Sequence, residues 1–289
     1  MKNFRGIFTA LLTPFDENDK INVEALRQLI DMNLKMGVTG FYVSGSTGEA
    51  FLMNENERKE LLRIVKEAAP DATLIAHIGS INEREALSLG KYSKELGYDA
   101  ISSVAPFYYK FSFEEIKNYY YRLAATAGLP MLVYNFPAFS GVNMGINELS
   151  QFLSSDMFFG LKHTSQDLFA LERCKTTFPD KTVYNGFDEM CLAGLSMGAD
   201  GAIGSTYNFM ADKFVKIYSL FNEGKMKAAY DIQKEANRII SALGKVGVTQ
   251  GEKEVLNQMG LPFGHCRTPF GELSKEQKDF IRKEITEKL

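Results

Sequence analysis

The chain alternates between short apolar runs and longer amphipathic segments up to about residue 208. In the amphipathic segments, apolar residues recur every three or four positions, as on one face of a helix. Short apolar strands that alternate with such helices predict a parallel sheet covered by helices. The predicted strands span residues 6–13, 40–45, 73–79, 100–105, 131–135, 157–164, 182–187 and 201–206.

Four of these strands have a glycine three positions before their first residue. These glycines are Gly37, Gly97, Gly128 and Gly198. Glycine is the usual residue where a helix ends, so the repeat indicates short helix-to-strand connections. Eight such units fit a closed (β/α)8 TIM barrel better than an open doubly wound sheet. The pattern then changes to helices alone, near residues 211–222, 225–243, 250–258 and 274–287. We therefore expect a barrel over 1–208 and a C-terminal helical extension over 209–289, packed on the barrel.

Composition narrows the class of protein. The 289 residues are 45% hydrophobic and 24% charged, with a formal net charge of −3. These values are ordinary for a globular protein, and they give no basic surface that would favour nucleic acid. Three widely spaced cysteines argue against a disulfide framework. The first residues lack a long apolar stretch, and no run reaches the roughly 18 apolar residues of a membrane span. We expect a cytoplasmic protein that binds neither nucleic acid nor membrane.

Lys162 is the most unusual residue of the pattern, because it ends an apolar strand. Strand alternation places Gly160, Lys162 and Thr164 on one face, with Leu161 and His163 on the other. Burial disfavours the ammonium form and lowers the pKa of a lysine. A neutral amine can attack a carbonyl and form a Schiff base. The plainer interpretation is a solvated lysine at a strand end.

Tyr134 occupies a similar place near the end of the preceding strand, and it shares a face with Leu132. At the mouth of a barrel such a phenol could relay a proton to or from a substrate hydroxyl. A buried aromatic residue whose hydroxyl is satisfied remains the alternative. We expect the two strands to be neighbours, so that Lys162 and Tyr134 share a pocket.

Small and acidic residues follow other strands at the same end of the barrel. Residues 45–49 (Gly-Ser-Thr-Gly-Glu) offer two hydroxyls and backbone N–H groups, which suit a carboxylate, although the segment could be an ordinary turn. Residues 204–206 (Gly-Ser-Thr) are similar. The acids of 186–189 (Gly-Phe-Asp-Glu) could bind polyol hydroxyls or merely stabilise a helix start. The aromatic residues of 106–109 (Pro-Phe-Tyr-Tyr) suit ligand stacking, core packing or a subunit interface.

Metal and nucleotide chemistry find no support in the motifs. The histidines His77, His163 and His265 form neither an HxH nor an HExxH pattern, and no P-loop or GxGxxG motif is present. We expect no metal and no organic cofactor.

Three motifs together resemble a known family. The segments 45–49, 134–137 (Tyr-Asn-Phe-Pro) and 160–164 (Gly-Leu-Lys-His-Thr) are similar, in order and spacing, to those of the class I pyruvate-dependent lyases. That family includes dihydrodipicolinate synthase and N-acetylneuraminate lyase. Ser46 in the first motif, Phe139 in place of a dicarboxylate-binding arginine, and the segments 106–113, 185–189 and 204–208 resemble the branch that cleaves sialic acid.

The resemblance implies a role for each site residue. Lys162 would be the Schiff-base nucleophile, and Tyr134 the proton donor or acceptor. Ser46 and Thr47 would bind the pyruvoyl carboxylate. The pocket for the sugar tail would be lined by Thr164, Gly186, Asp188, Glu189 and Ser205.

The resemblance also implies a reaction and an assembly. Open-chain N-acetylneuraminate would be cleaved to N-acetylmannosamine and pyruvate through a lysine Schiff base, without a cofactor. Tyr108 corresponds to a family tyrosine that reaches a neighbouring subunit's site, which implies a homotetramer. Thr249 stands where some lyases carry a phenylalanine, so the far end of the pocket can differ. Two alternatives stay open: a dihydrodipicolinate synthase or other sugar-acid aldolase, and a non-catalytic sensor of sugar acids.

Overall fold

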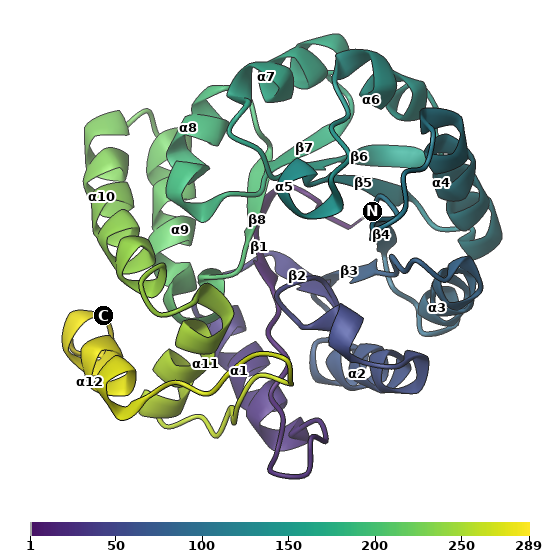
Figure 1. Cartoon of the computed structure of the whole chain (residues 1–289). Coiled ribbons are helices and arrows are strands. Elements are labelled where there is room, and N and C mark those ends of the chain that lie inside the picture. Colours follow the sequence, from purple (N-terminus) through teal and green to yellow (C-terminus); the bar gives the residue numbers. More distant parts are fainter. Residues whose placement is uncertain (1) are drawn as a thin grey trace.

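A closed barrel of eight parallel strands forms the centre of the molecule (Figure 1). The structure is a computed structural model that describes residues 2–289. Each strand pairs with the next in the chain, and β8 pairs with β1 to close the ring. The predicted (β/α)8 barrel is confirmed, and every strand starts within one residue of its predicted position. The strands are β1 Gly6–Ala10, β2 Gly40–Val43, β3 Thr73–His77, β4 Ala100–Val104, β5 Met131–Asn135, β6 Phe158–His163, β7 Thr182–Asn185 and β8 Gly201–Gly204.

Helices surround the barrel on its outside (Figure 1). One-turn elements were not predicted after β2 and β5, because a single turn is too short to show a helical period. These are η1 Ala50–Leu52 and α5 Pro137–Ser140. After β7 the chain forms η2 Asp188–Met190 and then α8 Cys191–Ser196. The other helices around the barrel are α1 Val23–Lys35, α2 Glu55–Ala68, α3 Glu83–Glu95, α4 Phe113–Ala127, α6 Ile146–Leu153, α7 Leu168–Thr177 and α9 Tyr207–Asn222.

Local sequence chemistry fixes several of these boundaries. Asn54 caps α2: its side chain accepts a hydrogen bond from Glu57 N, and the Glu57 carboxylate accepts one from Asn54 N. This reciprocal pair satisfies two backbone donors at the helix start. The glycines of the repeated loops have φ angles between +60° and +94° at Gly37, Gly97, Gly128 and Gly198, a region that favours glycine.

Two apolar layers hold the barrel together. The larger layer lies between the sheet and the surrounding helices. The smaller layer fills the barrel interior, where large residues such as Phe8, Tyr42 and Tyr184 are buried. Leu132 and Tyr134 belong to this inner layer, whereas Leu161 belongs to the outer one, as strand alternation predicts. The polar residues therefore meet at the carboxyl ends of the strands, above a filled interior.

The C-terminal segments lie together on one flank of the barrel (Figure 1). They are α10 Met226–Leu243, α11 Val248–Gln258, α12 Lys275–Glu284 and η3 Thr286–Lys288. α10 packs on α9, and α11 contacts α9, α10 and α12. The division of the chain at residue 208 stays a prediction. None of the helices within residues 2–289 combines the length and apolar character needed to cross a bilayer.

Candidate active site

Lys162 and Tyr134 are Cα partners across the β5–β6 ladder, so the two strands are neighbours as expected. The Lys162 ammonium nitrogen, Nζ, lies 4.2 Å from the ring centre of Tyr134 and 4.6 Å from that of Tyr42. The lysine is only 5% exposed, and within residues 2–289 no hydrogen bond or ion pair reaches its Nζ. Burial lowers the pKa of Lys162 to about 7, although the negative charge of Asp188 acts in the opposite direction. A large fraction of this amine is therefore neutral and nucleophilic at neutral pH.

The phenol of Tyr134 is buried in an aromatic cluster. Its ring meets Tyr42 edge-on, with centres 6.0 Å apart, and stacks on Phe136 at 5.7 Å. Burial raises the pKa of Tyr134 above its ordinary value, while the hydroxyls of Thr164 and Ser46 lower it. The phenol therefore keeps its proton at neutral pH and can act as a proton donor.

The segment after β2 is a compact turn with half-buried Ser46 and Thr47. Ser44 and Glu49, at its two ends, have φ angles of +61° and +57°. Left-handed backbone is unfavourable for side chains of this kind, so surrounding contacts must hold the turn. A Cβ at Gly48 would lie 2.9 Å from the Leu11 carbonyl oxygen, which explains the glycine there.

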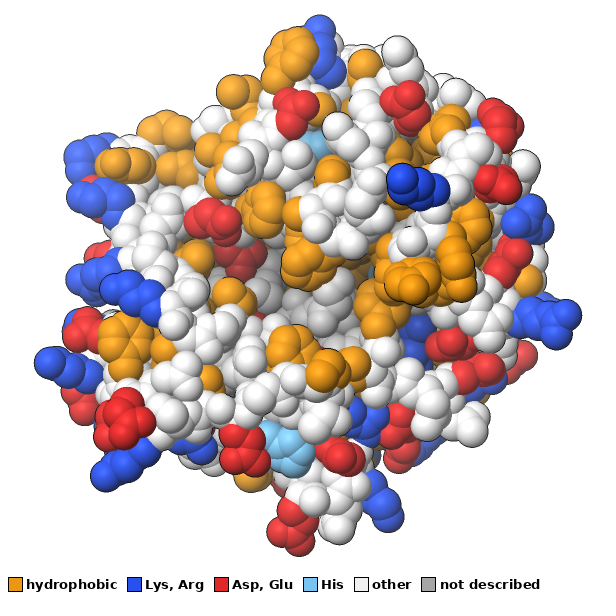
Figure 2. Space-filling model, viewed as in Figure 1, with side chains coloured by type: hydrophobic (Ala, Val, Ile, Leu, Met, Phe, Trp, Pro, Cys, Tyr) orange, Lys and Arg blue, Asp and Glu red, His pale blue; other side chains and the backbone are white. Residues whose placement is uncertain are grey.

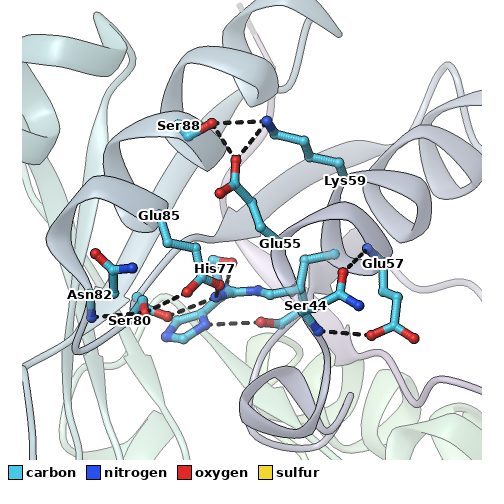
Figure 3. A network of polar contacts seen from close by, with 12 residues as sticks. Ser44, Glu55, Glu57, Lys59, His77, Ser80, Asn82, Glu85 and Ser88 are labelled. Carbon is cyan, nitrogen blue, oxygen red and sulfur yellow. Dashed lines mark hydrogen bonds and ion pairs between the residues drawn. The ribbon is translucent and has the colours of Figure 1, made fainter.

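A buried polar network holds the first end of this turn (Figure 3). Arg58 is completely buried and donates to Ser44 Oγ at 3.0 Å, and to the carbonyl oxygens of His77 and Gly79. Its Nη1 is 3.3 Å from a Glu85 carboxylate oxygen. His77 Nδ1 lies 2.9 Å from Ser44 O, and Val104 N donates to Nε2, which fixes the proton of the neutral ring on Nδ1. Burial lowers the pKa of His77 to about 3.

The C-terminal extension holds the other end of the same turn. Lys253 Nζ lies 2.5 Å from Glu49 Oε1, and both side chains are buried. The other carboxylate oxygen of Glu49 accepts a hydrogen bond from Arg267 N at 2.8 Å. The turn that carries Ser46 and Thr47 is thus fixed by α2 on one side and by the extension on the other.

Asp188 begins η2, shortly after the strand that pairs with the Lys162 strand. Its Oδ2 accepts hydrogen bonds from Thr206 N at 2.8 Å and from Thr206 Oγ1 at 2.6 Å. Burial raises the pKa of Asp188 to about 6, although the Thr206 donors oppose this change. A Cβ at Gly204 would lie 1.9 Å from Asp188 Oδ1, so glycine is required there. Glu189, its neighbour in the chain, is exposed instead.

The remaining predicted residues differ in their surroundings. Thr164 is buried, and its hydroxyl lies beside the Tyr134 phenol, whose pKa it lowers. Gly186 lies directly against it, because a Cβ there would be 1.9 Å from Thr164 Oγ1. Ser205 donates to Glu252 Oε1 at 2.6 Å. Tyr108 is 84% exposed and has a φ angle of +77°, so it lies on the surface rather than beside the buried lysine.

A cavity of about 520 Å³ opens next to Ser46. Its walls are mainly apolar and include Phe51, Phe107, Phe139 and Phe270. Figure 2 shows the same face of the molecule, where hydrophobic side chains border a hollow near the centre. The cavity gives a small molecule access to the loop after β2.

Sequence reasoning missed Arg58 and Glu252, which are charged residues on the buried faces of helices. Arg58 precedes Leu61, Leu62 and Val65 by three, four and seven positions, which places it on the apolar face of α2. That spacing was a usable signal, since a charge on such a face needs a partner. Glu252 carries a similar signal, because it lies in α11 directly after Gly251 and three positions before Val255.

Comparison with known proteins gives the same picture over the whole length. The family model described as the dihydrodipicolinate synthetase family matches residues 3–288. An N-acetylneuraminate lyase from Histophilus somni strain 2336 is 44% identical and is covered, like this chain, over 100% of its length. An N-acetylneuraminate lyase from Rhizobium meliloti is 46% identical, with 97% of this chain and 94% of the relative covered.

Solved structures agree with the sequence comparisons. CdNal from Clostridium difficile, solved in complex with mannosamine, is 38% identical with a TM-score of 0.96, and 99% of this chain and 100% of that one are covered. A sialic acid aldolase from Ruminococcus gnavus, solved as a catalytic lysine mutant, is 28% identical with a TM-score of 0.94 over 98% of this chain and 96% of that one. The barrel, the buried lysine at its mouth and these matches lead to one conclusion: the chain belongs to the dihydrodipicolinate synthetase family.

Proposed function

We propose that this protein is a carbon–carbon lyase that cleaves open-chain N-acetylneuraminate into N-acetylmannosamine and pyruvate. The single observation that carries the proposal is the buried Lys162 amine, whose pKa is lowered to about 7, beside the Tyr134 phenol. The names of the relatives at 44% and 46% identity support this substrate. The R. gnavus aldolase, with its catalytic lysine, supports a lysine-based mechanism.

The proposed reaction starts with attack of neutral Lys162 on the C2 ketone of the substrate, and water is released as the iminium forms. The C4 hydroxyl then gives up its proton, the C3–C4 bond breaks, and its electrons move into the iminium. The products of this step are N-acetylmannosamine and a pyruvate enamine on the lysine. Protonation at C3 and hydrolysis of the iminium release pyruvate and return the amine.

Tyr134 is proposed to relay the C4 proton: its protonated phenol gives its own proton to the substrate carboxylate as it takes the proton of the C4 hydroxyl. Ser46 and Thr47 are proposed to bind the carboxylate of the substrate. The polyol tail would then lie toward Asp188 and Ser205, with Thr164, Gly186 and Glu189 around it. The conversion needs no metal or organic cofactor, because the protonated imine itself accepts the electrons.

Assembly and location belong to the same proposal. The exposed Tyr108, with its strained backbone, suits a residue that contacts a second subunit in a homotetramer. Reduced, buried cysteines are compatible with the cytoplasm.

Dihydrodipicolinate synthase is the main alternative within the family. Phe139, which is 70% exposed beside the cavity, offers no charge for a second carboxylate and so disfavours it.

One pair of assays tests the proposal. Borohydride with pyruvate is expected to leave a reduced adduct on Lys162, and Lys162→Ala is expected to lose both the adduct and cleavage while remaining folded. Cleavage of N-acetylneuraminate, followed by pyruvate release, is expected to exceed condensation of pyruvate with aspartate semialdehyde. Tyr134→Phe is expected to lower kcat by about 10²–10⁴-fold. Faster condensation would favour the synthase, and ligand affinity without adduct or turnover would favour a sensor.

A further inference from the structure

Glu252 is a buried acid of the C-terminal extension to which the proposed reaction gives no role. It lies on α11 and is completely buried. Its Oε1 accepts a hydrogen bond from Ser205 Oγ, with 2.6 Å between the two oxygens. Its Oε2 is also buried and has no hydrogen-bond partner within residues 2–289. Burial raises the pKa of Glu252 to about 8, and the charge of Asp188 acts in the same direction. The hydrogen bond from Ser205 makes Oε1 the accepting oxygen in either protonation state, because a neutral acid then carries its proton on Oε2.

Ion pairing does not explain why an acid is buried at position 252. Lys253, which follows it in the chain, is already paired with Glu49 at 2.5 Å. Within residues 2–289, Glu252 has no ion pair of its own, and its contact with Ser205 is its one side-chain hydrogen bond. A buried acid with a single polar contact contributes little to stability compared with an apolar residue of the same volume. Its effect must be sought in what that one contact does to Ser205.

The contact fixes the hydrogen-bonding character of Ser205. A serine hydroxyl has one proton to donate and two lone pairs to accept with. Because the hydroxyl donates its hydrogen bond to Glu252 Oε1, only the lone pairs of Ser205 remain for a ligand. The backbone of Ser205 is held as well, because its carbonyl oxygen accepts from Asn208 Nδ2 at 2.6 Å and from Asn208 N at 3.1 Å.

Asp188 presents a second acceptor next to Ser205. Its Oδ2 is occupied by two donors from Thr206, the residue that follows Ser205. Its Oδ1 receives no hydrogen bond from residues 2–289. This oxygen lies against Gly204, the last residue of β8 and the residue before Ser205. This side of the mouth thus offers acceptors from two adjacent positions, which suits a ligand that donates two hydroxyl protons.

We infer that Glu252 is a positioning residue that turns Ser205 into an acceptor and so selects a sugar-acid tail with free hydroxyl groups. This inference rests on the proposed function, since it assigns the tail-binding side of the same site. A tail whose hydroxyl is methylated or acetylated has no O–H to donate, so the Ser205 oxygen receives no hydrogen bond from it. The C-terminal extension thereby takes part in substrate choice through a residue that does not touch the substrate.

Kinetics with two substrates test this role. The first substrate is N-acetylneuraminate, and the second is a 4-hydroxy-2-oxo acid without tail hydroxyls. Glu252→Met and Ser205→Ala are each expected to raise KM for N-acetylneuraminate about tenfold, because each variant loses one hydrogen bond to the substrate tail. The double variant should show no further increase, because both changes remove the same interaction. Glu252→Met should leave kcat and KM for the second substrate, and borohydride trapping of pyruvate, unchanged.

Two controls separate positioning from structure. Glu252→Gln keeps a neutral acceptor and is expected to bind N-acetylneuraminate like the wild type. Glu254→Met changes an acid of the same helix that contacts Gln258 and Lys278 instead, and its KM should not change. Additive effects in the double variant, or equal losses on both substrates, would overturn the inference.

The remaining outcomes are also decisive. If Glu252→Met does not fold, the pair Glu252→Gln and Ser205→Ala still decides, because a wild-type KM in Ser205→Ala contradicts the role. A wild-type protein that traps no pyruvate refutes the proposed function instead. Trapping and cleavage by the wild type, with no coupling between Glu252 and Ser205, refute this inference alone.

Discussion

The pH dependence of adduct formation at Lys162 is the most direct test of the site. Burial lowers the pKa of this amine from its ordinary 10.5 to about 7. At pH 7 an ordinary lysine is only about 0.03% neutral, whereas this one is about half neutral, a gain of about 10³-fold in reactive amine. The same change corresponds to about 5 kcal/mol of free energy by which burial disfavours the ammonium form. The rate of pyruvate trapping should therefore rise with pH around a midpoint near 7.

Asp188 provides the perturbation, because its charge raises the pKa of Lys162. In Asp188→Asn the midpoint of the trapping profile is expected to move to lower pH. Glu189→Gln is the matched control, since it removes an exposed neighbouring acid and should leave the midpoint in place. The assay uses pyruvate alone, so that binding of the sugar tail plays no part. A wild-type midpoint of 9 or above, or an upward movement in Asp188→Asn, would falsify the reasoning.

The same pKa has a consequence for stability. Between pH 7 and 10.5 the unfolded chain binds the Lys162 proton and the folded chain does not, so that stability rises with pH across this window. Lys162→Met removes this dependence. It is expected to raise the free energy of unfolding by several kcal/mol at pH 6, up to about 5 kcal/mol, with the gain disappearing toward pH 10.5. Urea unfolding at a series of pH values measures it, and a gain that is constant with pH would contradict the assignment.

Two further predictions concern groups that support the site. Arg58→Met should lower the free energy of unfolding by about 3–5 kcal/mol, because Ser44 Oγ and two carbonyl oxygens lose their buried donor. The control is Arg63→Met, on the same helix but half exposed. In the same urea unfolding assay it should change the free energy of unfolding by less than about 0.5 kcal/mol. Gly204→Ala places a Cβ 1.9 Å from a carboxylate oxygen and should reduce cleavage strongly, whereas Gly271→Ala, with no atom within 4 Å of its Cβ, should leave activity intact; equal kinetics in the two alanine variants would refute the close contact.

Much of the barrel was predictable because its strands are short, apolar and bounded by recognisable helix ends. Strand alternation correctly placed Leu132 and Tyr134 on one face and separated Leu161 from Lys162, and the structure shows that the first two are inside the barrel and Leu161 is outside. The position of Lys162 at the end of an apolar strand allowed either a buried or a solvated amine, and the structure shows it buried. What the pattern did not contain was the register, and only the structure pairs Lys162 directly with Tyr134.

The missed features share a physical reason. Arg58 and Glu252 are charged, and charge in a helical pattern usually marks the solvent side. Their burial depends on partners far away in the chain, such as Gly79 for Arg58 and Ser205 for Glu252. Local periodicity contains no information on such partners. One-turn elements such as η1 and α5 escaped for a simpler reason, since they are shorter than one period of the signal.

The pairing of Tyr134 with Lys162 across two hydrogen-bonded strands bears on how this scaffold can be re-engineered. Neighbouring strands lie about 4.8 Å apart in any sheet, so the backbone ladder places the lysine and tyrosine side chains next to each other. Asp188 and Ser205, by contrast, follow β7 and β8 in the connecting loops. In the proposed mechanism, bond cleavage and tail choice thus belong to separable parts of the chain, and grafted loops are expected to change the tail that is accepted while Lys162 and Tyr134 stay in place.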